Sequence, residues 1–121
     1  MYRVLISGDR NGIDGAIIER EVRALIGRHG KTHLIGIGGG ASGVDLQCEL
    51  TFKRHSVHFA RVDALWDTRY RGAGPQRNTA MLGLQPDELI AFHIDIKNSK
   101  GTKDMVKQAE KLGIPTRVVR R

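Results

Sequence analysis

Short apolar runs alternate along the chain with longer segments whose apolar residues recur every three or four positions. The runs are typical of buried parallel strands, and the longer segments are typical of amphipathic helices. The predicted strands are residues 2–7, 33–37, 57–62, 88–93 and 116–119. This alternation predicts an α/β fold, namely a single Rossmann-like three-layer domain over residues 1–121, with a mostly parallel five-stranded sheet and helices on both faces.

The predicted helices have recognisable boundaries. An apolar stripe over residues 17–26 predicts a first helix that ends near Gly30. Ser42, with Asp45 three residues later, resembles a capping box that opens a second helix. Pro75 lies at the start of a third helix, where its missing N–H group costs nothing. The predicted apolar face of the last helix consists of Met105, Val106, Ala109 and Leu112.

The loop after the second predicted strand is the strongest candidate for a binding site. Its sequence, Gly38-Gly39-Gly40-Ala41-Ser42-Gly43, satisfies the pattern G-x-G-x-x-G between a strand and a helix. Backbone N–H groups at a helix start favour a phosphate, and glycine lets that phosphate approach closely. Asp63 lies at the end of the next predicted strand, where a dinucleotide-binding fold has a ribose-binding carboxylate. The alternative is a tight turn that needs glycine only for steric reasons.

Other loops are expected at the same edge of the sheet. Residues 99–102, Ser-Lys-Gly-Thr, combine hydroxyls, a lysine and a glycine at a helix start, which suits a phosphate, although N-capping alone would explain the hydroxyls. Arg77 is predicted in the first turn of its helix, where the helix dipole disfavours a cation. A bound anion or a salt bridge would each account for that position. The first loop brings Arg10 to the same edge.

The positive net charge of the chain favours anionic partners. The net charge is +7, and residues 97–121 contribute most of it, with eight Lys and Arg against two acidic residues. Nucleic-acid binding and a merely solvated helix face both fit this segment. The single Cys48 excludes an internal disulfide, and the five histidines lack metal-ligand spacing, so we predict neither a metal nor a cofactor. No apolar run approaches the roughly 20 residues of a membrane span, and the first strand begins at once, so a cytoplasmic protein is expected.

Four motifs, in order, resemble one family over nearly the whole chain. They are Gly8-Asp9-Arg10, Gly38–Asp45, Ala73–Asn78 and Ser99–Met105. Their order and spacing are similar to the YspA/YpsA-related branch of the SLOG superfamily. That superfamily includes the Lonely-guy (lysine-decarboxylase-like) phosphoribohydrolases and the Rossmann-like domain of the DNA-processing protein DprA. The resemblance implies glycine loops that bind a nucleotide or a nucleotide-derived ligand, in proteins that often form homo-oligomers.

The resemblance also points to the catalytic positions of the hydrolase relatives. Arg77 matches their arginine, but Met105 occupies the position of their glutamate, and a thioether cannot act as an acid or a base. The neighbouring carboxylate, Asp104, lies about 100° away around the helix. Arg77 and Asp104 are the candidate catalytic residues if the chain is an enzyme, and the sequence leaves that question open.

The leading hypothesis is therefore a nucleotide-binding module, which could be a sensor, a sequestering protein or a nucleotide-processing enzyme. Loop amides would hold the phosphate, Arg77 would neutralise it, and Asp45 would accept a hydrogen bond from a ribose hydroxyl. The alternatives are an N-glycosidase acting on nucleoside 5′-monophosphates and DprA-like nucleic-acid binding. The residues expected to contact the ligand are Gly8, Arg10, Gly38, Gly39, Gly40, Ser42, Gly43, Asp45, Arg77, Asn78, Ser99, Lys100, Gly101 and Thr102.

Overall fold

A computed structural model describes residues 1–65, 72–93 and 100–120 of the chain. Within these ranges five strands alternate with helices, as the apolar pattern predicts. The strands are β1 (Tyr2–Gly8), β2 (Leu34–Gly38), β3 (His58–Arg61), β4 (Glu88–Phe92) and β5 (Thr116–Val119). The helices are α1 (Gly15–His29), the short 3-10 helix η1 (Lys31–His33), α2 (Val44–Arg54), α4 (Ala73–Leu82) and α5 (Lys100–Lys111).

The strands form one parallel sheet in the order β3-β2-β1-β4-β5. The chain runs outward from β1 to β3 and then returns to the other side of β1 to form β4 and β5. The strand order therefore reverses between β1 and β4, whose carboxyl ends lie side by side with Gly8 opposite Phe92. Open parallel sheets bind ligands outside the carboxyl ends of the strands at such a reversal. A binding site is therefore expected at the loops after β1 and β4.

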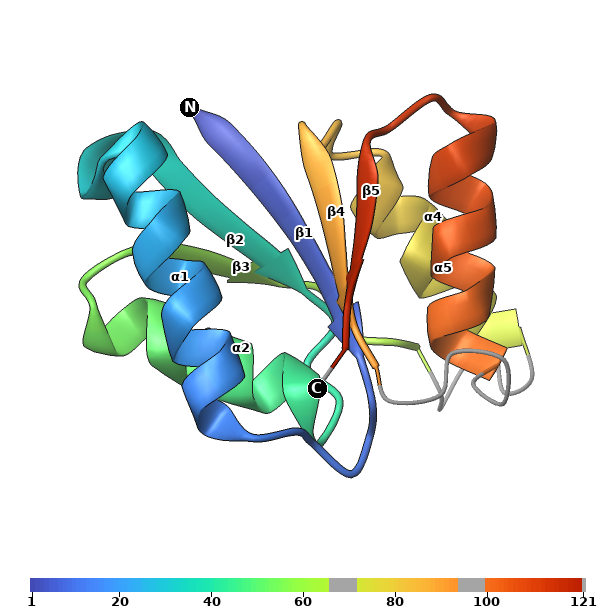
Figure 1. The fold of residues 1–121 in the computed structure, drawn as a ribbon. Helices are drawn as coiled ribbons and strands as arrows, with labels where there is room; N and C mark the ends of the chain where they lie inside the picture. Colours follow the sequence, from blue (N-terminus) through green and yellow to red (C-terminus); the bar gives the residue numbers. More distant parts are fainter. Residues whose placement is uncertain (66–71, 94–99, 121) are drawn as a thin grey trace.

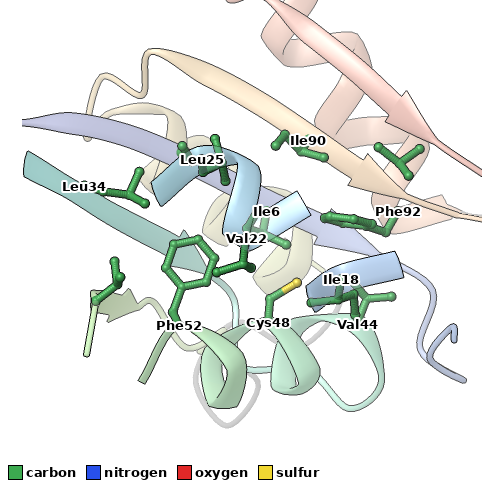
Figure 2. Close-up of a cluster of buried hydrophobic side chains, with 13 residues drawn as sticks. Ile6, Ile18, Val22, Leu25, Leu34, Val44, Cys48, Phe52, Ile90 and Phe92 are labelled. Atoms are coloured by element: carbon green, nitrogen blue, oxygen red, sulfur yellow. The ribbon is translucent and has the colours of Figure 1, made fainter. Parts of the chain in front are cut away.

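Two apolar clusters hold the helices to the sheet. The first lies under α1 and α2 and contains Val4 and Ile6 of β1, with Phe52 of α2 (Figure 2). The second lies under α4 and α5 and contains Leu5, Leu89 and other fully buried side chains. Successive residues of β1 point to opposite faces, so one central strand supplies both clusters. The result is the predicted three-layer arrangement, with α1 and α2 on one face and α4 and α5 on the other (Figure 1).

Three local expectations are wrong. Leu112 lies beyond the last residue of α5 and is 64% exposed, so it takes no part in the apolar face of that helix. Ser42 does not cap α2, because Gly43 is the N-cap residue and the Ser42 hydroxyl donates to the carbonyl oxygen of Arg10 at 3.3 Å. Arg77 lies in the second turn of α4, since that helix begins at Ala73. Among the described helices, none is both long and apolar enough to cross a bilayer.

Candidate functional site

The carboxyl ends of β1 and β4 open into a cavity of about 530 Å³, called here the β1/β4 cavity. Its walls come from the loop after β1, from α2 and the loop before it, from α4, from the residue after β4 and from the start of α5. The structure therefore brings together loops that are far apart in the sequence, as expected from the topology. The lining residues are Ile6 to Asn11, Ala41, Asp45, Arg77, Asn78, Met81, His93, Lys100, Gly101 and Thr102.

A second cavity of about 580 Å³ adjoins the first, since Arg10, Ala41 and Arg77 line both. The glycine loop contributes mainly to this second cavity, which is lined further by Gly39, Gly40, Ser42, Asp63 and Ala64. Asp63, the less favoured candidate for a ribose acceptor after Asp45, is highly exposed and lies 3.7 Å from the Nε atom of Arg61. Of the other predicted contacts, Gly38 and Gly43 line neither cavity, and Ser99 lies outside the described residues.

Three cations line the β1/β4 cavity. Arg10 and Lys100 are exposed, and Arg77 is half-buried. None of the three forms an ion pair within the described part of the chain. Arg77 donates from Nη1 to the carbonyl oxygen of Gly39 at 3.3 Å, and its buried Nε has no hydrogen-bond partner among those residues. The cavity therefore presents three cations without an ion-pair partner among the described residues, although the charge of Arg77 also acts on Asp45.

Asp45, which is buried, forms a hydrogen bond with the glycine loop. The backbone N–H group of Ala41 donates to its carboxylate at 3.3 Å, and the backbone amide of Gly39 also acts on the pKa of that carboxylate. Burial raises the pKa of Asp45, and the two amides, with Arg77 and Arg61, act in the opposite direction. The Ala41 amide thus donates to a carboxylate of the chain itself. An anion in the cavity would depend mainly on side-chain cations and on other donors.

Close packing explains two of the predicted contact glycines. A Cβ atom on Gly43 would lie 2.3 Å from the carbonyl oxygens of both Asp9 and Arg10, and the residue has a φ of +78°. A Cβ atom on Gly8 would lie 2.5 Å from the carbonyl oxygen of Phe92. At these positions the steric interpretation is sufficient, because the loops after β1 and β2 press against each other. Gly101 differs, since a Cβ atom there would meet nothing within 4 Å.

Polar side chains fix the start of α5 at the cavity. Thr102, which is buried, donates from its hydroxyl to the carbonyl oxygen of Gly8 at 3.3 Å. Asn78 of α4, also buried, donates to the carbonyl oxygen of Gly101 at 3.3 Å and to the carboxylate of Asp104 at 2.8 Å. These bonds tie α4 and β1 to α5 and hold Lys100 and Gly101 at the cavity wall.

The two candidate catalytic residues are not brought together at the cavity. Arg77 lines it, but Asp104 does not, and the Asp104 carboxylate is occupied by the side-chain amides of Asn78 and Gln108, each at 2.8 Å. Met105, in the position of the family's glutamate, is fully buried in the second apolar cluster. Neither residue offers a carboxylate to a ribosyl centre in the cavity.

Sequence reasoning missed that His93 and Asp9 lie together at the cavity. His93 follows β4 and places its Nε2 atom 3.8 Å from the Asp9 carboxylate, which also accepts the backbone N–H of Asn11 at 2.9 Å. Their position directly after β1 and β4 at the reversal of strand order was the available indication. In the described ranges, no group of three His, Cys, Asp or Glu side chains is arranged to hold a metal ion.

Comparison with known proteins supports the fold. No family model matches the chain, and no curated protein matches it. Among solved structures, DNA processing protein A from Helicobacter pylori, described for its single-stranded DNA binding mode, is similar with a TM-score of 0.73 and 17% identity over 99% of this chain. DprA from Streptococcus pneumoniae is similar with a TM-score of 0.62 and 14% identity over 98% of this chain.

The chain spans 66% and 58% of the lengths of these two proteins. At such identities the likeness concerns the fold, and it extends over almost all of the present chain. It shows that the chain shares the fold of these two proteins. The assignment to the YspA/YpsA-related branch remains a prediction from the motifs.

Proposed function

We propose that this chain binds single-stranded nucleic acid through phosphate groups held in the β1/β4 cavity. The observation that carries the proposal is the convergence of Arg10, Arg77 and Lys100 on one cavity without an ion pair to any described carboxylate. Each phosphate of a strand carries one negative charge, and a protein that neutralises it releases condensed counterions. The similarity to a DNA processing protein A that binds single-stranded DNA supports this choice of ligand.

Two carboxylates also line the cavity, but both are engaged. Asp45 is buried and accepts the backbone N–H of Ala41 in its own loop, and Asp9 accepts the backbone N–H of Asn11 and lies 3.8 Å from Nε2 of His93. Their charges are therefore partly compensated within the wall. The cations at the rim, especially exposed Arg10 and Lys100, remain available to phosphate. As part of the same proposal, the chain acts in the cytoplasm.

The salt dependence of binding tests the proposal. Fluorescence anisotropy with a labelled oligothymidylate of about 16 nucleotides, the upper site size of a compact single-strand-binding domain, gives the dissociation constant across a salt series. The double variant Arg10→Gln/Lys100→Gln should bind more weakly and should lower the slope of log K against log salt by about 1.4, since each lost phosphate contact contributes about 0.7.

The matched control removes the same number of positive charges at the amino ends of the strands, away from the cavity. Arg28 and Lys31 are exposed near the start of β2, so Arg28→Gln/Lys31→Gln should leave the slope within error. If the wild-type protein fails to bind the strand at low salt, or if both double variants lower the slope equally, the proposed site is wrong.

A nucleotide or nucleotide-derived ligand is the second candidate, and the size of the cavity favours it. About 530 Å³ lies within the range of roughly 300–1,000 Å³ seen for small-molecule sites. Such binding would suit a sensor, a sequestering protein or a processing enzyme. The N-glycosidase version is less well supported, because the Asp104 carboxylate is occupied by Asn78 and Gln108 away from the cavity. The other two candidate carboxylates, Asp9 and Asp45, line the cavity but each accepts a backbone N–H.

Thermal unfolding with a panel of nucleotides distinguishes the two candidates. A ligand at 100 times its dissociation constant adds about 2.7 kcal/mol to the free energy of unfolding. If a mononucleotide protects the protein as well as an oligonucleotide does, and affinity does not grow with strand length, the small-ligand function is correct and strand binding is a side effect.

A further inference from the structure

Helix α5 carries a row of exposed lysines that begins at the β1/β4 cavity. Their spacing of three and four residues places them within an arc of about 80° on one helix face. The opposite face is buried against the sheet. The row, called here the lysine row, consists of Lys100, Lys103, Lys107 and Lys111, and the buried face consists of Thr102, Met105 and Ala109.

The lysine row lacks the ion pairs that other helices of the chain form. On α1, Arg23 lies 3.8 Å from Glu19 one turn away, and on α2, Lys53 lies 3.0 Å from Glu49. No lysine of α5 has such a partner within the part of the chain that the structure describes. Of the two acids on α5, Asp104 is bonded to Asn78 and Gln108, and Glu110 is exposed next to the row without an ion pair to a described lysine. Like charges at this spacing destabilise a helix, and an anionic partner would relieve that repulsion.

We propose that the lysine row is the path along which a nucleic-acid strand leaves the β1/β4 cavity. This inference rests on the proposed function and adds to it a direction and a second contact surface. Lys100 belongs both to the cavity wall and to the row, so the positive surface is continuous. From Lys100 to Lys111 the row spans about 16 Å, at about 1.5 Å per residue.

A single strand suits the row better than a membrane surface does. Helices that lie in a membrane interface bury large apolar side chains between lipid head groups. Over the length of α5 no large apolar side chain is among the exposed ones, and the apolar face points into the core. The row offers charge alone, which matches a phosphate backbone.

Strand length separates the row from the cavity in an experiment. A labelled strand of about 4 nucleotides is short enough to occupy the cavity alone, whereas one of about 16 nucleotides extends along α5. In the variant Lys103→Gln/Lys107→Gln, the slope of log K against log salt for the long strand should fall by about 1.4, and binding of the short strand should stay within twofold of wild type. Glutamine removes the charge and has a helix propensity similar to that of lysine, and circular dichroism checks that the variant folds.

The outcomes of these measurements distinguish the proposed function from the path along α5. If Arg10→Gln/Lys100→Gln weakens both strands while Lys103→Gln/Lys107→Gln weakens neither, the proposed function stands and the path along α5 is wrong. If the wild-type protein binds neither strand, both proposals fall. Wild-type binding to phosphatidylserine vesicles that exceeds strand binding, and that is lost in Lys103→Gln/Lys107→Gln, assigns the row to a membrane and overturns the inference. Arg28→Gln/Lys31→Gln again serves as the charge-matched control.

Discussion

Gly43 and Gly101 belong to similar motifs but have opposite surroundings. Gly43 adopts a φ of +78° and presses against two backbone carbonyl groups, so any side chain there must move the loop after β1. Gly101 lies in the first turn of α5 with open space around it. Glycine at position 43 is therefore required for packing, whereas glycine at position 101 leaves the backbone accessible to a ligand.

Two alanine substitutions test this difference. Gly43→Ala should lower the free energy of unfolding by about 3 kcal/mol, the upper end of the cost of a strained backbone position. Gly101→Ala should raise it by up to about 1 kcal/mol, because alanine favours the helix, and should weaken strand binding because Gly101 lines the cavity. Urea unfolding and anisotropy measure the two quantities. Equal stability losses in the two variants would contradict the steric explanation.

At the scale of elements, the carboxylate of Glu19 near the start of α1 connects that helix to the end of α2. Both carboxylate oxygens of Glu19 lie 2.7 Å from the Nε2 atom of His55, and Arg54 donates to the same carboxylate at 3.0 Å. Hydrogen bonds from His55 and then from Arg54 lower the pKa of Glu19 below its ordinary value of 4.5. The folded state therefore favours the ionised carboxylate.

This link predicts a pH-dependent loss of stability. Because the pKa of Glu19 is lower in the folded state than in the unfolded state, its contribution is complete above pH 4.5 and disappears as pH falls through the folded-state pKa. Glu19→Gln should lower the thermal midpoint at pH 7, and the gap to wild type should close in acid. Thermal melts from pH 7 to about pH 3 measure the gap, and Glu110→Gln is the control. A gap that stays constant or widens in acid would refute the link.

The elements themselves were largely predictable from the apolar pattern. The periodicity predicted α1 and its end near Gly30, and the apolar runs located every strand to within a residue or two, because burial imposes both patterns directly. The beginning of α2 was not predictable. Ser42 and Asp45 have the spacing of a capping box, but the Ser42 hydroxyl donates to the carbonyl oxygen of Arg10. That contact depends on the packing of two loops that are distant in the sequence.

At the scale of the whole molecule, the sheet order turns separate motifs into one cavity. Motif spacing gave Arg77 and Lys100 as candidates, and the parallel fold explains why they meet at one edge. The role of Asp45 could not be predicted, since its contact with the loop amides depends on how Gly39 and Ala41 are turned. Nor could pattern alone show that Asp104 would be occupied by Asn78.

The same arrangement predicts that the chain unfolds as one unit. Phe52 belongs to the cluster under α1 and α2, and Leu89 to the cluster under α4 and α5, but β1 and β4 supply side chains to both clusters. Loss of either cluster should therefore destabilise the whole sheet. Phe52→Ala should lower the free energy of unfolding by about 3–5 kcal/mol and Leu89→Ala by about 2–5 kcal/mol.

Urea unfolding followed by far- and near-ultraviolet circular dichroism measures this cooperativity. Each variant should shift the midpoint of a single transition, coincident by both probes, with an unchanged dependence on urea. Leu50→Ala is the control, because Leu50 is 55% exposed and its removal should cost no more than about 0.5 kcal/mol. A second transition that appears in only one of the core variants would mean that the two halves of the sheet are separately stable, and the cavity between β1 and β4 would then lie on a boundary between two folding units.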